Sequence, residues 1–310
     1  MHALLRIPVV LPLVATILLM LLVQSTRRQV SCRVGAPLDV ESVDSIASVR
    51  DEVRQLRELV ENDTHRRHED KSLSDPPGES PKTVLVGLLT VPSKLQRRAL
   101  IRSTYLQIKP PEVDFFFVFG TPATLEDARL LEWEQRLYKD IIIIDCEENM
   151  DSGKTFHFFD HVARTFPDGK YPFVMKTDDD VWLHLPNLAE RLQSSPRQGT
   201  YFGRSVQDSF MAGMGYAVSW DIVKWISTDS FPGENKIGQE DAMLAWWLQR
   251  GQVIKNWISE DYEFYDDPSF KEGWAHDYTP GTILVHRLKN ETLFIRASAH
   301  FLEPQKTTRR

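Results

Sequence analysis

The stretch VMKTDDDVWLHL, residues 174–185, places three consecutive aspartates inside an apolar run. Residues 172–180 have the character of a buried strand, and Asp178, Asp179 and Asp180 stand at its end. Adjacent carboxylates repel one another, by about 4 kcal/mol for a pair about 4 Å apart at an effective dielectric constant of about 20. Water around an exposed acidic turn would relieve this repulsion, and so would a cation. The apolar flanks favour the cation, and the oxygen ligands favour Mg²⁺ or Mn²⁺, which commonly bridge a protein to substrate phosphates.

Similar apolar strands alternate with helical patterns before this stretch. Strands are predicted at 83–91, 113–120, 140–146 and 172–180, and helices at 96–108, 125–139 and 153–166. This alternation indicates an α/β domain with a mostly parallel central sheet flanked by helices, which we place at 82–303. Functional groups in such sheets lie at the carboxyl ends of the strands, where the three aspartates stand.

The N-terminal part of the chain has a different character. Residues 7–23 carry no charge and follow a short tail at 1–6, which predicts a transmembrane signal-anchor or, alternatively, a signal peptide cleaved near Ser25. Both interpretations put the remaining chain in a secretory lumen. The glycosylation sequons at Asn62 and Asn290 agree with that location.

A stem is predicted at 24–81. Apolar residues recur at spacings of three and four between Ile46 and Val60, which indicates a short coiled-coil-like helix or a single amphipathic helix. A coiled coil here would make the chain a homodimer. Residues 61–81 are polar, with three prolines, and are typical of a linker, while 304–310 form a C-terminal tail.

The net charge narrows the classes of partner. The 310 residues carry a net charge of −7, which gives no basic footprint for nucleic acid. Such a chain can still bind an anionic substrate through a cation. The segment SGKT at 152–155 matches half of a phosphate-binding P-loop, but Glu148 stands where that motif needs glycine, so we exclude an NTPase of this type.

Six motifs occur in an order that resembles glycosyltransferase family 31, the β-1,3-galactosyltransferase-like enzymes of the Golgi. They are QRRALIRSTY (96–105), FFFVFG (115–120), KTDDDVWL (176–183), AGMGYAVS (212–219), GQEDAML (238–244) and VHRLK (285–289). The chain departs from the family pattern at Tyr105, where tryptophan is usual, and at Ala242, where valine is usual.

The resemblance implies a fold and an activity. The fold is the GT-A type, which binds a nucleotide-sugar. The activity is inverting transfer of galactose or N-acetylglucosamine from a UDP-sugar to a hydroxyl of an acceptor glycan or glycoconjugate, in β-1,3 linkage and with Mn²⁺ or another divalent cation. The location is the Golgi membrane, single-pass type II, with a luminal catalytic domain.

The family pattern also implies roles for single residues. Asp180 is the expected metal ligand, with Asp178 on or near the metal, and His286 is a further ligand or else a structural hydrogen-bonding residue. Inverting transfer needs one base. Asp241 is the expected base and Glu240 the fallback, although two acids also suit the first turn of a helix predicted at 238–250.

Donor binding is the role implied for a further group. Arg98 and Arg102 share a helix face and are expected near the nucleotide or its supporting acids, unless that face is simply solvated. The glycines of AGMGYAVS allow a close backbone approach to the donor sugar, or else a tight turn. The full set of predicted donor residues is Arg98, Arg102, Lys176, Asp178, Asp179, Gly213, Gly215 and Tyr216. Lys176 could pair with the arginines or reach a phosphate, and Asp179 could instead be structural and pair with backbone amides.

Two other functions compete with the transferase. A catalytically inactive luminal glycan-binding protein on the same fold would have lost a metal or base residue, yet Asp180, Asp241 and His286 are all present. A metal-dependent phosphohydrolase would need further ligands at other strand ends, and the sequence offers no convincing set. The transferase is therefore the function that the sequence favours.

Overall fold

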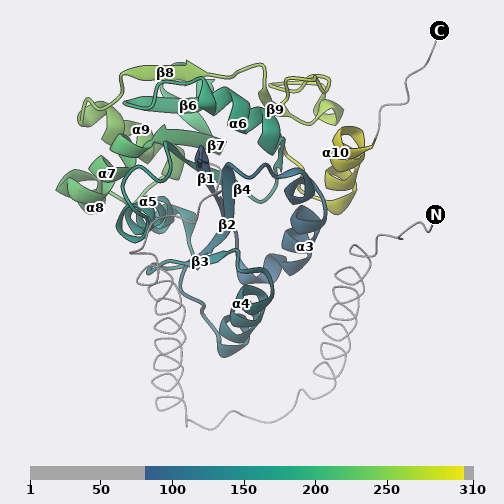
Figure 1. The fold of residues 1–310 in the computed structure, drawn as a ribbon, viewed down its shortest axis with the longest axis horizontal. Coiled ribbons are helices and arrows are strands. Elements are labelled where there is room, and N and C mark those ends of the chain that lie inside the picture. The colour runs from purple at the N-terminus through teal and green to yellow at the C-terminus, as the bar shows by residue number, and fades with distance from the viewer. Residues whose placement is uncertain (1–80, 304–310) are drawn as a thin grey trace, which may run out of the picture. The chain divides into compact units, whose positions relative to one another are not determined.

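The computed structural model describes residues 81–303 (Figure 1). The predicted tail at 1–6, signal-anchor at 7–23 and stem at 24–81, except for its last residue, lie outside the described residues, as does the tail at 304–310. Within 81–303, no helix is both long enough and apolar enough to cross a bilayer.

Strands and helices alternate along the first half of the described chain. The strands are β1 (Val84–Leu89), β2 (Val113–Phe119), β3 (Ile141–Ile143), β4 (Phe173–Asp178), β5 (Trp182–Leu183), β6 (Thr200–Val206), β7 (Phe210–Ser219), β8 (Asn256–Ser259), β9 (Phe264–Asp266) and β10 (Leu284–His286). The α-helices are α3 (Leu95–Ser103), α4 (Leu125–Tyr138), α5 (Lys154–Thr165), α6 (Leu185–Gln193), α7 (Trp220–Thr228), α8 (Ser230–Glu234), α9 (Glu240–Arg250) and α10 (Glu291–Leu302). Short 3₁₀ helices are η1 (Pro92–Lys94), η2 (Tyr105–Ile108), η3 (Met150–Ser152) and η4 (Pro268–Phe270).

The central sheet has seven strands in the order β3-β2-β1-β4-β7-β6-β8. Neighbours pair in parallel except at β7, which is antiparallel to both β4 and β6. The α/β prediction with a mostly parallel sheet is therefore confirmed. The register puts Leu89 of β1 opposite both Val118 of β2 and Asp178 of β4, so three strands end at one edge.

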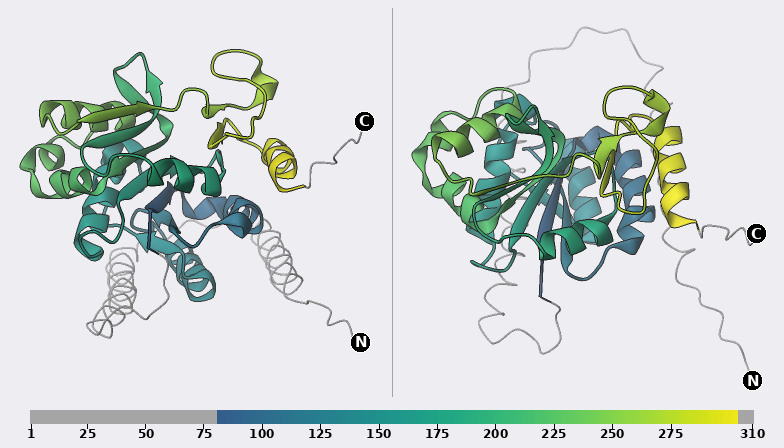
Figure 2. Two further views of the ribbon diagram at one scale, coloured as in Figure 1. Left: turned by 45° about the horizontal axis from the view of Figure 1, so that its top comes forward. Right: turned by 90° about the horizontal axis from the view of Figure 1, so that it is seen from above.

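Helices cover both faces of the sheet (Figures 1 and 2). One core joins the sheet to α3, α4, α6 and α10, and the other joins it to α5, α7 and α9. Residues of β1 alternate between them, since Val84, Val86 and Leu88 belong to the first core and Leu85 and Leu89 to the second. This alternation explains why β1 is apolar throughout.

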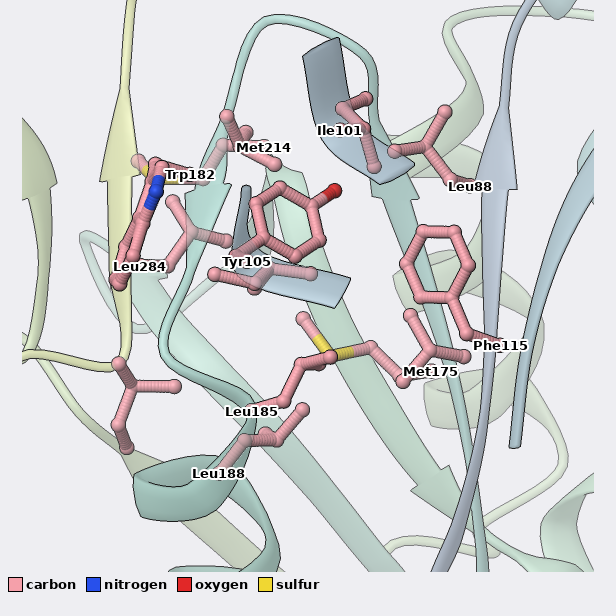
Figure 3. Packing of buried hydrophobic residues seen from close by; sticks show 14 of the residues in the cluster. Leu88, Ile101, Tyr105, Phe115, Met175, Trp182, Leu185, Leu188, Met214 and Leu284 are labelled. Atoms are coloured by element: carbon pink, nitrogen blue, oxygen red, sulfur yellow. The ribbon is translucent and has the colours of Figure 1, made fainter. Parts of the chain in front are cut away.

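A second, three-stranded sheet lies beside the first. Its order is β5-β10-β9, and β10 pairs antiparallel with β5 and parallel with β9. The chain therefore leaves the central sheet at Asp178, turns, and enters the second sheet at Trp182. Buried Trp182 and Leu284 of this sheet belong to the first core, and the ring centroids of Trp182 and Tyr105 lie 6.0 Å apart in an edge-on arrangement (Figure 3).

Two predicted elements are shorter than expected. The helix predicted at 96–108 ends at Ser103 and gives way to η2, because the Thr104 hydroxyl donates to the Leu100 carbonyl oxygen and the backbone leaves the helical region. The strand predicted at 140–146 covers only β3. The chain bends after it, with the Cys146 amide donating to the Ile144 carbonyl oxygen and the Thr121 amide to that of Cys146.

Candidate active site

The three aspartates occupy the turn between the two sheets. Asp178 is the last residue of β4, while Asp179 and Asp180 form the turn that leads into β5. The Thr90 hydroxyl, just beyond β1, donates to Asp179 Oδ2 over 2.8 Å. Asp179 thus ties together the ends of two neighbouring strands. The structure gives it this supporting contact, and its predicted role at the donor stays a prediction.

Asp180 faces His286 across the junction of the two sheets. Antiparallel pairing of β5 with β10 brings them together, and the Leu288 amide donates to the Asp180 carbonyl oxygen over 2.8 Å. His286 Nε2 lies 3.7 Å from Asp180 Oδ1, which is too long for a hydrogen bond. Both side chains are about one fifth exposed, so solvent or a ligand can reach them.

This pair fits one end of a metal site. An imidazole nitrogen and a carboxylate oxygen are both suitable ligands for Mn²⁺. Two ligand bonds of about 2.1 Å each can span a gap of up to about 4.2 Å, which includes the separation of this pair. Within 81–303 there is no group of three or more His, Cys, Asp or Glu side chains arranged to hold a metal. Any further ligands would therefore come from a rearranged side chain, a substrate phosphate or water.

Asp178, the other predicted metal ligand, is paired with a lysine. Its Oδ1 lies 2.9 Å from Lys176 Nζ. Desolvation raises the pKa of Asp178 above its ordinary value against the opposing charge of Lys176. The 33% of its side chain that stays exposed limits the size of this rise. Metal binding by Asp178 stays a prediction. It would require the Asp178 carboxylate to contact both the metal and Lys176.

Lys176 itself is fully buried, with a relative exposure of 0%. Its ammonium group contacts three acceptors, namely the Gly213 carbonyl oxygen at 2.7 Å, Asp178 Oδ1 and Glu240 Oε1. Burial alone would lower the pKa of Lys176, but the charges of Asp178 and Glu240 outweigh burial and raise it. All three N–H donors are therefore used inside the protein, and Lys176 holds the site together rather than reaching out to phosphate.

The carboxylate of Glu240, the fallback base, likewise has several hydrogen-bonding partners. Besides Lys176, it accepts from the Tyr216 hydroxyl over 2.6 Å and from the Thr155 hydroxyl over 3.1 Å. Three donors on one carboxylate leave it poorly suited to take a proton from a substrate. The assignment of Asp241 as the base, with Glu240 as the fallback, stays a prediction.

Asp241 stands at the first turn of α9, beside β7. Its Oδ2 accepts from the Gly213 amide over 3.1 Å, and its Oδ1 accepts from the Ala242 amide over 2.8 Å. Burial raises the pKa of the Asp241 carboxyl, and the neighbouring charge of Glu240 adds to the rise. A carboxylate with a raised pKa is a stronger base, and two backbone donors fix its orientation.

The glycines of β7 serve packing. A Cβ at Gly213 would lie 2.9 Å from Glu240 Oε1 and 3.2 Å from Asp241 Oδ2, so its absence lets α9 approach β7. A Cβ at Gly215 would lie 2.7 Å from Leu284 and 2.9 Å from Met175, both in the core. The alternative that these residues form a tight turn is wrong because both lie within a strand. Gly215 and Tyr216 are both buried, so a contact between either of them and the donor sugar has no support here.

The two predicted arginines lie in α3 and form ion pairs with acidic side chains. Fully buried Arg98 forms a double ion pair with Glu134 and donates to the Val91 and Pro92 carbonyl oxygens over 2.8 and 3.1 Å. Arg102 pairs with Glu134 and Asp140. Their predicted role near the nucleotide or its supporting acids stays a prediction. Arg98 in particular fixes the loop after β1 and is too deeply buried to contact a ligand.

A second network at the same edge was not predicted. Buried Lys154, the first residue of α5, donates to the Thr90 carbonyl oxygen over 2.8 Å and pairs with Glu148. Glu148 in turn accepts from the Gly120 amide at the end of β2 over 2.7 Å. The segment SGKT therefore links the ends of β1 and β2, although it is no P-loop. A lysine directly at the start of an amphipathic helix was the available signal.

Asp266 is the other residue that sequence reasoning missed. It ends β9, is 2% exposed, and its Oδ1 lies 2.8 Å from His286 Nδ1. Parallel pairing of β9 with β10 sets Asp266 directly opposite His286. The only available signal was an acid pair, Asp266 and Asp267, after the aromatic residues Phe264 and Tyr265.

Comparison with known proteins identifies related sequences. Residues 96–208 match the Galactosyltransferase family. The chain is 34% identical over 128 residues to the lactosylceramide 1,3-N-acetyl-beta-D-glucosaminyltransferase of Rattus norvegicus, which covers 37% of this chain and 33% of that protein. It is 24% identical over 288 residues to the beta-1,3-galactosyltransferase pvg3 of Schizosaccharomyces pombe, which covers 72% and 75%. The chain thus spans about a third of the rat relative and three quarters of the yeast one.

Solved structures give a more distant likeness. An active-site mutant of LgtC is matched with a TM-score of 0.43 at 10% identity, over 73% of this chain and 98% of that one. The galactosyltransferase LgtC in complex with donor and acceptor sugar analogs gives a TM-score of 0.41 at 11% identity, over 66% of this chain and 86% of that one. The family match and the sequence relatives carry the assignment. The match over residues 96–208 and the sequence relatives confirm the predicted resemblance to glycosyltransferase family 31.

Proposed function

We propose that the chain is an inverting, metal-dependent hexosyltransferase that moves galactose or N-acetylglucosamine from a UDP-sugar to a hydroxyl of an acceptor glycan, in β-1,3 linkage. The observation that carries this proposal is the pair formed by Asp180 and His286, whose ligand atoms face each other 3.7 Å apart at the junction of the two sheets. The sugars and the linkage come from the names of the relatives, a beta-1,3-galactosyltransferase and a 1,3-N-acetylglucosaminyltransferase.

Asp180 and His286 would hold the cation, and Asp178, at the end of β4, is the proposed further ligand. When bound, a divalent cation would neutralise the donor diphosphate and make UDP a better leaving group. This arrangement lets a chain with a net charge of −7 bind an anionic donor. The role of Asp180 and His286 is therefore to bind and orient, rather than to move protons.

Asp241 is the base of the proposed reaction. An acceptor hydroxyl attacks the anomeric carbon of the donor sugar, the bond from that carbon to the diphosphate breaks, and Asp241 takes the hydroxyl proton. A single displacement of this kind inverts the anomeric configuration and needs no nucleophile from the protein. The raised pKa of Asp241 and its two backbone donors suit this task.

Lys176 connects the two parts of the site. Its ammonium group contacts Asp178 on the metal side and Glu240, the residue before Asp241, on the base side. Because Lys176 is fully buried in β4, these contacts hold the strand end and the start of α9 in a fixed relation. Such fixed geometry between donor and base is what a displacement reaction requires.

The proposed setting is the Golgi membrane. Residues 7–23 would anchor the chain as a single-pass type II protein, with the stem at 24–81 and the catalytic domain at 82–303 in the lumen. The charge-free segment and the sequons support this setting, and Asn290 is exposed at the start of α10. Glycosidase-sensitive glycans at Asn290 on the membrane-bound protein would test it, and an unmodified, membrane-free protein would contradict it.

Donor binding tests the function directly. Calorimetry on the full chain in detergent would measure the affinity for UDP-galactose and UDP-N-acetylglucosamine, with Mn²⁺ and with a chelator. We expect one donor to bind with Mn²⁺ only, and Asp180→Ala to abolish binding. Asp168→Ala, an exposed aspartate outside the site, is the matched control and should bind like the wild type. Equal binding in the chelator, or in Asp180→Ala, would contradict the proposal.

A further inference from the structure

The contacts of His286 are unequal at its two ring nitrogens. Nδ1 lies 2.8 Å from Asp266 Oδ1, within hydrogen-bond range, whereas Nε2 lies 3.7 Å from Asp180 Oδ1. A carboxylate can only accept a hydrogen bond, so Nδ1 must carry the proton of this contact. In the neutral imidazole, Nε2 then keeps its lone pair, and that lone pair faces Asp180.

Asp266 is well placed to hold this arrangement. It is 2% exposed and stands opposite His286 in the parallel register of β9 and β10, so both backbones fix the relative position of the two side chains. Its backbone amide also donates to the Trp274 carbonyl oxygen over 3.4 Å. Arg287 Nε lies 3.3 Å from Asp266 Oδ2, which leaves Oδ1 for the histidine.

The neighbouring acid has a different task. Asp267 accepts from the Ser269 hydroxyl over 2.6 Å and from the Tyr278 hydroxyl over 2.7 Å, and it pairs with Arg296. These contacts hold the following loop and α10, and none involves the imidazole. Two adjacent buried aspartates are thus separated by function: Asp267 holds the fold and Asp266 holds His286.

We propose that Asp266 is a positioning residue that fixes the Nδ1-protonated form and the ring orientation of His286, so that Nε2 is ready to bind the divalent cation. This inference rests on the proposed metal-dependent function. Carboxylate partners of metal-binding histidines orient the ring and strengthen it as a ligand, and their loss typically weakens metal affinity 10-fold to 100-fold. Asp266 would thereby prepare the site before donor and metal arrive.

Metal affinity in an isosteric variant tests the proposal. Mn²⁺ binding to the full chain in detergent, with UDP present, would be followed by the paramagnetic resonance signal of free Mn²⁺. We expect Asp266→Asn to weaken Mn²⁺ binding about 10-fold to 100-fold. The control is Asp267→Asn, which removes a charge from the adjacent buried aspartate and should lower the thermal midpoint while leaving Mn²⁺ affinity within about twofold of wild type.

A second measurement does not depend on the variant folding. Nitrogen NMR would be recorded on metal-free wild-type chain labelled in histidine, and the signals of His286 would be assigned from their loss in His286→Ala. We expect His286 to have a protonated Nδ1 and an unprotonated Nε2. Nε2 protonation with a bare Nδ1, or wild-type Mn²⁺ affinity in Asp266→Asn, would overturn the inference. If wild type binds no Mn²⁺, the proposed function fails, and the protonation state of His286 still decides whether Asp266 positions it.

Discussion

Two adjacent carboxylates at the start of α9 have opposite surroundings. Glu240 accepts from Tyr216, Thr155 and Lys176, whereas within residues 81–303 Asp241 accepts only from backbone amides. The former is held by side chains from three elements and stabilises the packing of α9. The latter keeps the capacity to accept a proton, because backbone donors orient it without neutralising its charge.

Replacing Asp241 by asparagine should remove the base without removing bulk. We expect Asp241→Asn to lower kcat about 10²-fold to 10⁴-fold, while the affinity for Mn²⁺ and the UDP-sugar stays within a few fold of wild type. Steady-state kinetics and calorimetry on one preparation would measure both. Asp208→Asn, in the exposed turn between β6 and β7, is the control. An Asp241→Asn variant with near-wild-type kcat would rule out this base.

The pH dependence of the rate should report the same residue. A base works as the carboxylate, so activity is present above its pKa and is lost as the pH falls through it. Burial raises the pKa of Asp241, so the acid limb of the kcat profile should lie above the value of about 3.9 for an ordinary aspartate. A profile with saturating donor would measure this limb. A rate that stays constant down to pH values near 4 would contradict a base whose pKa is raised by burial.

At the scale of elements, the site depends on the contact between β4, β7 and α9. Gly213 lies in β7 opposite the acids of α9, and Lys176 of β4 reaches both its carbonyl oxygen and Glu240. Thus β4, β7 and α9, which are distant in sequence, come together at the ammonium group of Lys176 and at Gly213, where the missing Cβ leaves room for α9. Variants at Lys176 and Gly213 separate the contribution of the charge from that of the close approach.

Removing the charge should cost stability. In Lys176→Met, Asp178 and Glu240 lose their partner in or near the interior, and we expect the free energy of unfolding to fall by about 3–5 kcal/mol. Chemical denaturation would measure the loss. Lys224→Met, which breaks a surface pair with Asp168, should cost at most about 1 kcal/mol. Equal losses in the two variants would mean that the buried contacts of Lys176 contribute little.

Filling the close approach should disturb the base instead. In Gly213→Ala the new Cβ would press on Glu240 Oε1 and Asp241 Oδ2, and we expect kcat to fall about 10-fold to 100-fold as Asp241 moves. Gly233→Ala is the control, because there the added Cβ meets only the ring edge of Phe156 at 3.3 Å. Kinetics of both variants, with thermal midpoints to verify folding, decide the point. Unchanged kcat in Gly213→Ala would show that the approach is not critical.

At the scale of the whole molecule, sequence patterns predicted what is local. The strands from β1 to β4 and the helices between them follow from continuous apolar runs and helical periodicity, and the aspartates follow from their place at a strand end. The junction of the two sheets was out of reach. β9 is only three residues long, too short for a reliable pattern, and its pairing with β10 is what brings Asp266 to His286.

The same limit explains the residues whose surroundings differ from expectation. Lys176, Gly215 and Tyr216 stand in or beside recognisable motifs, but a motif does not reveal which way a strand residue faces. The structure turns Tyr216 and Lys176 toward Glu240 and Gly215 toward Leu284. At Lys176, Gly215 and Tyr216 the motif residues therefore serve the packing that builds the site more than direct contact with a ligand.

Release of UDP by the full chain, supplied with hexoside acceptors and with UDP-galactose or UDP-N-acetylglucosamine, is the most direct test of the proposed function. We predict release from one donor in Mn²⁺ and at least a 100-fold loss, about 2.7 kcal/mol in the barrier, in a chelator, in Asp180→Ala and in His286→Ala. Asp168→Ala should match the wild type. Undiminished release in the chelator or in both site variants would contradict the assignment of Asp180 and His286 as the metal-binding pair. Donor binding without release from any donor would instead favour an inactive glycan-binding protein on the same fold.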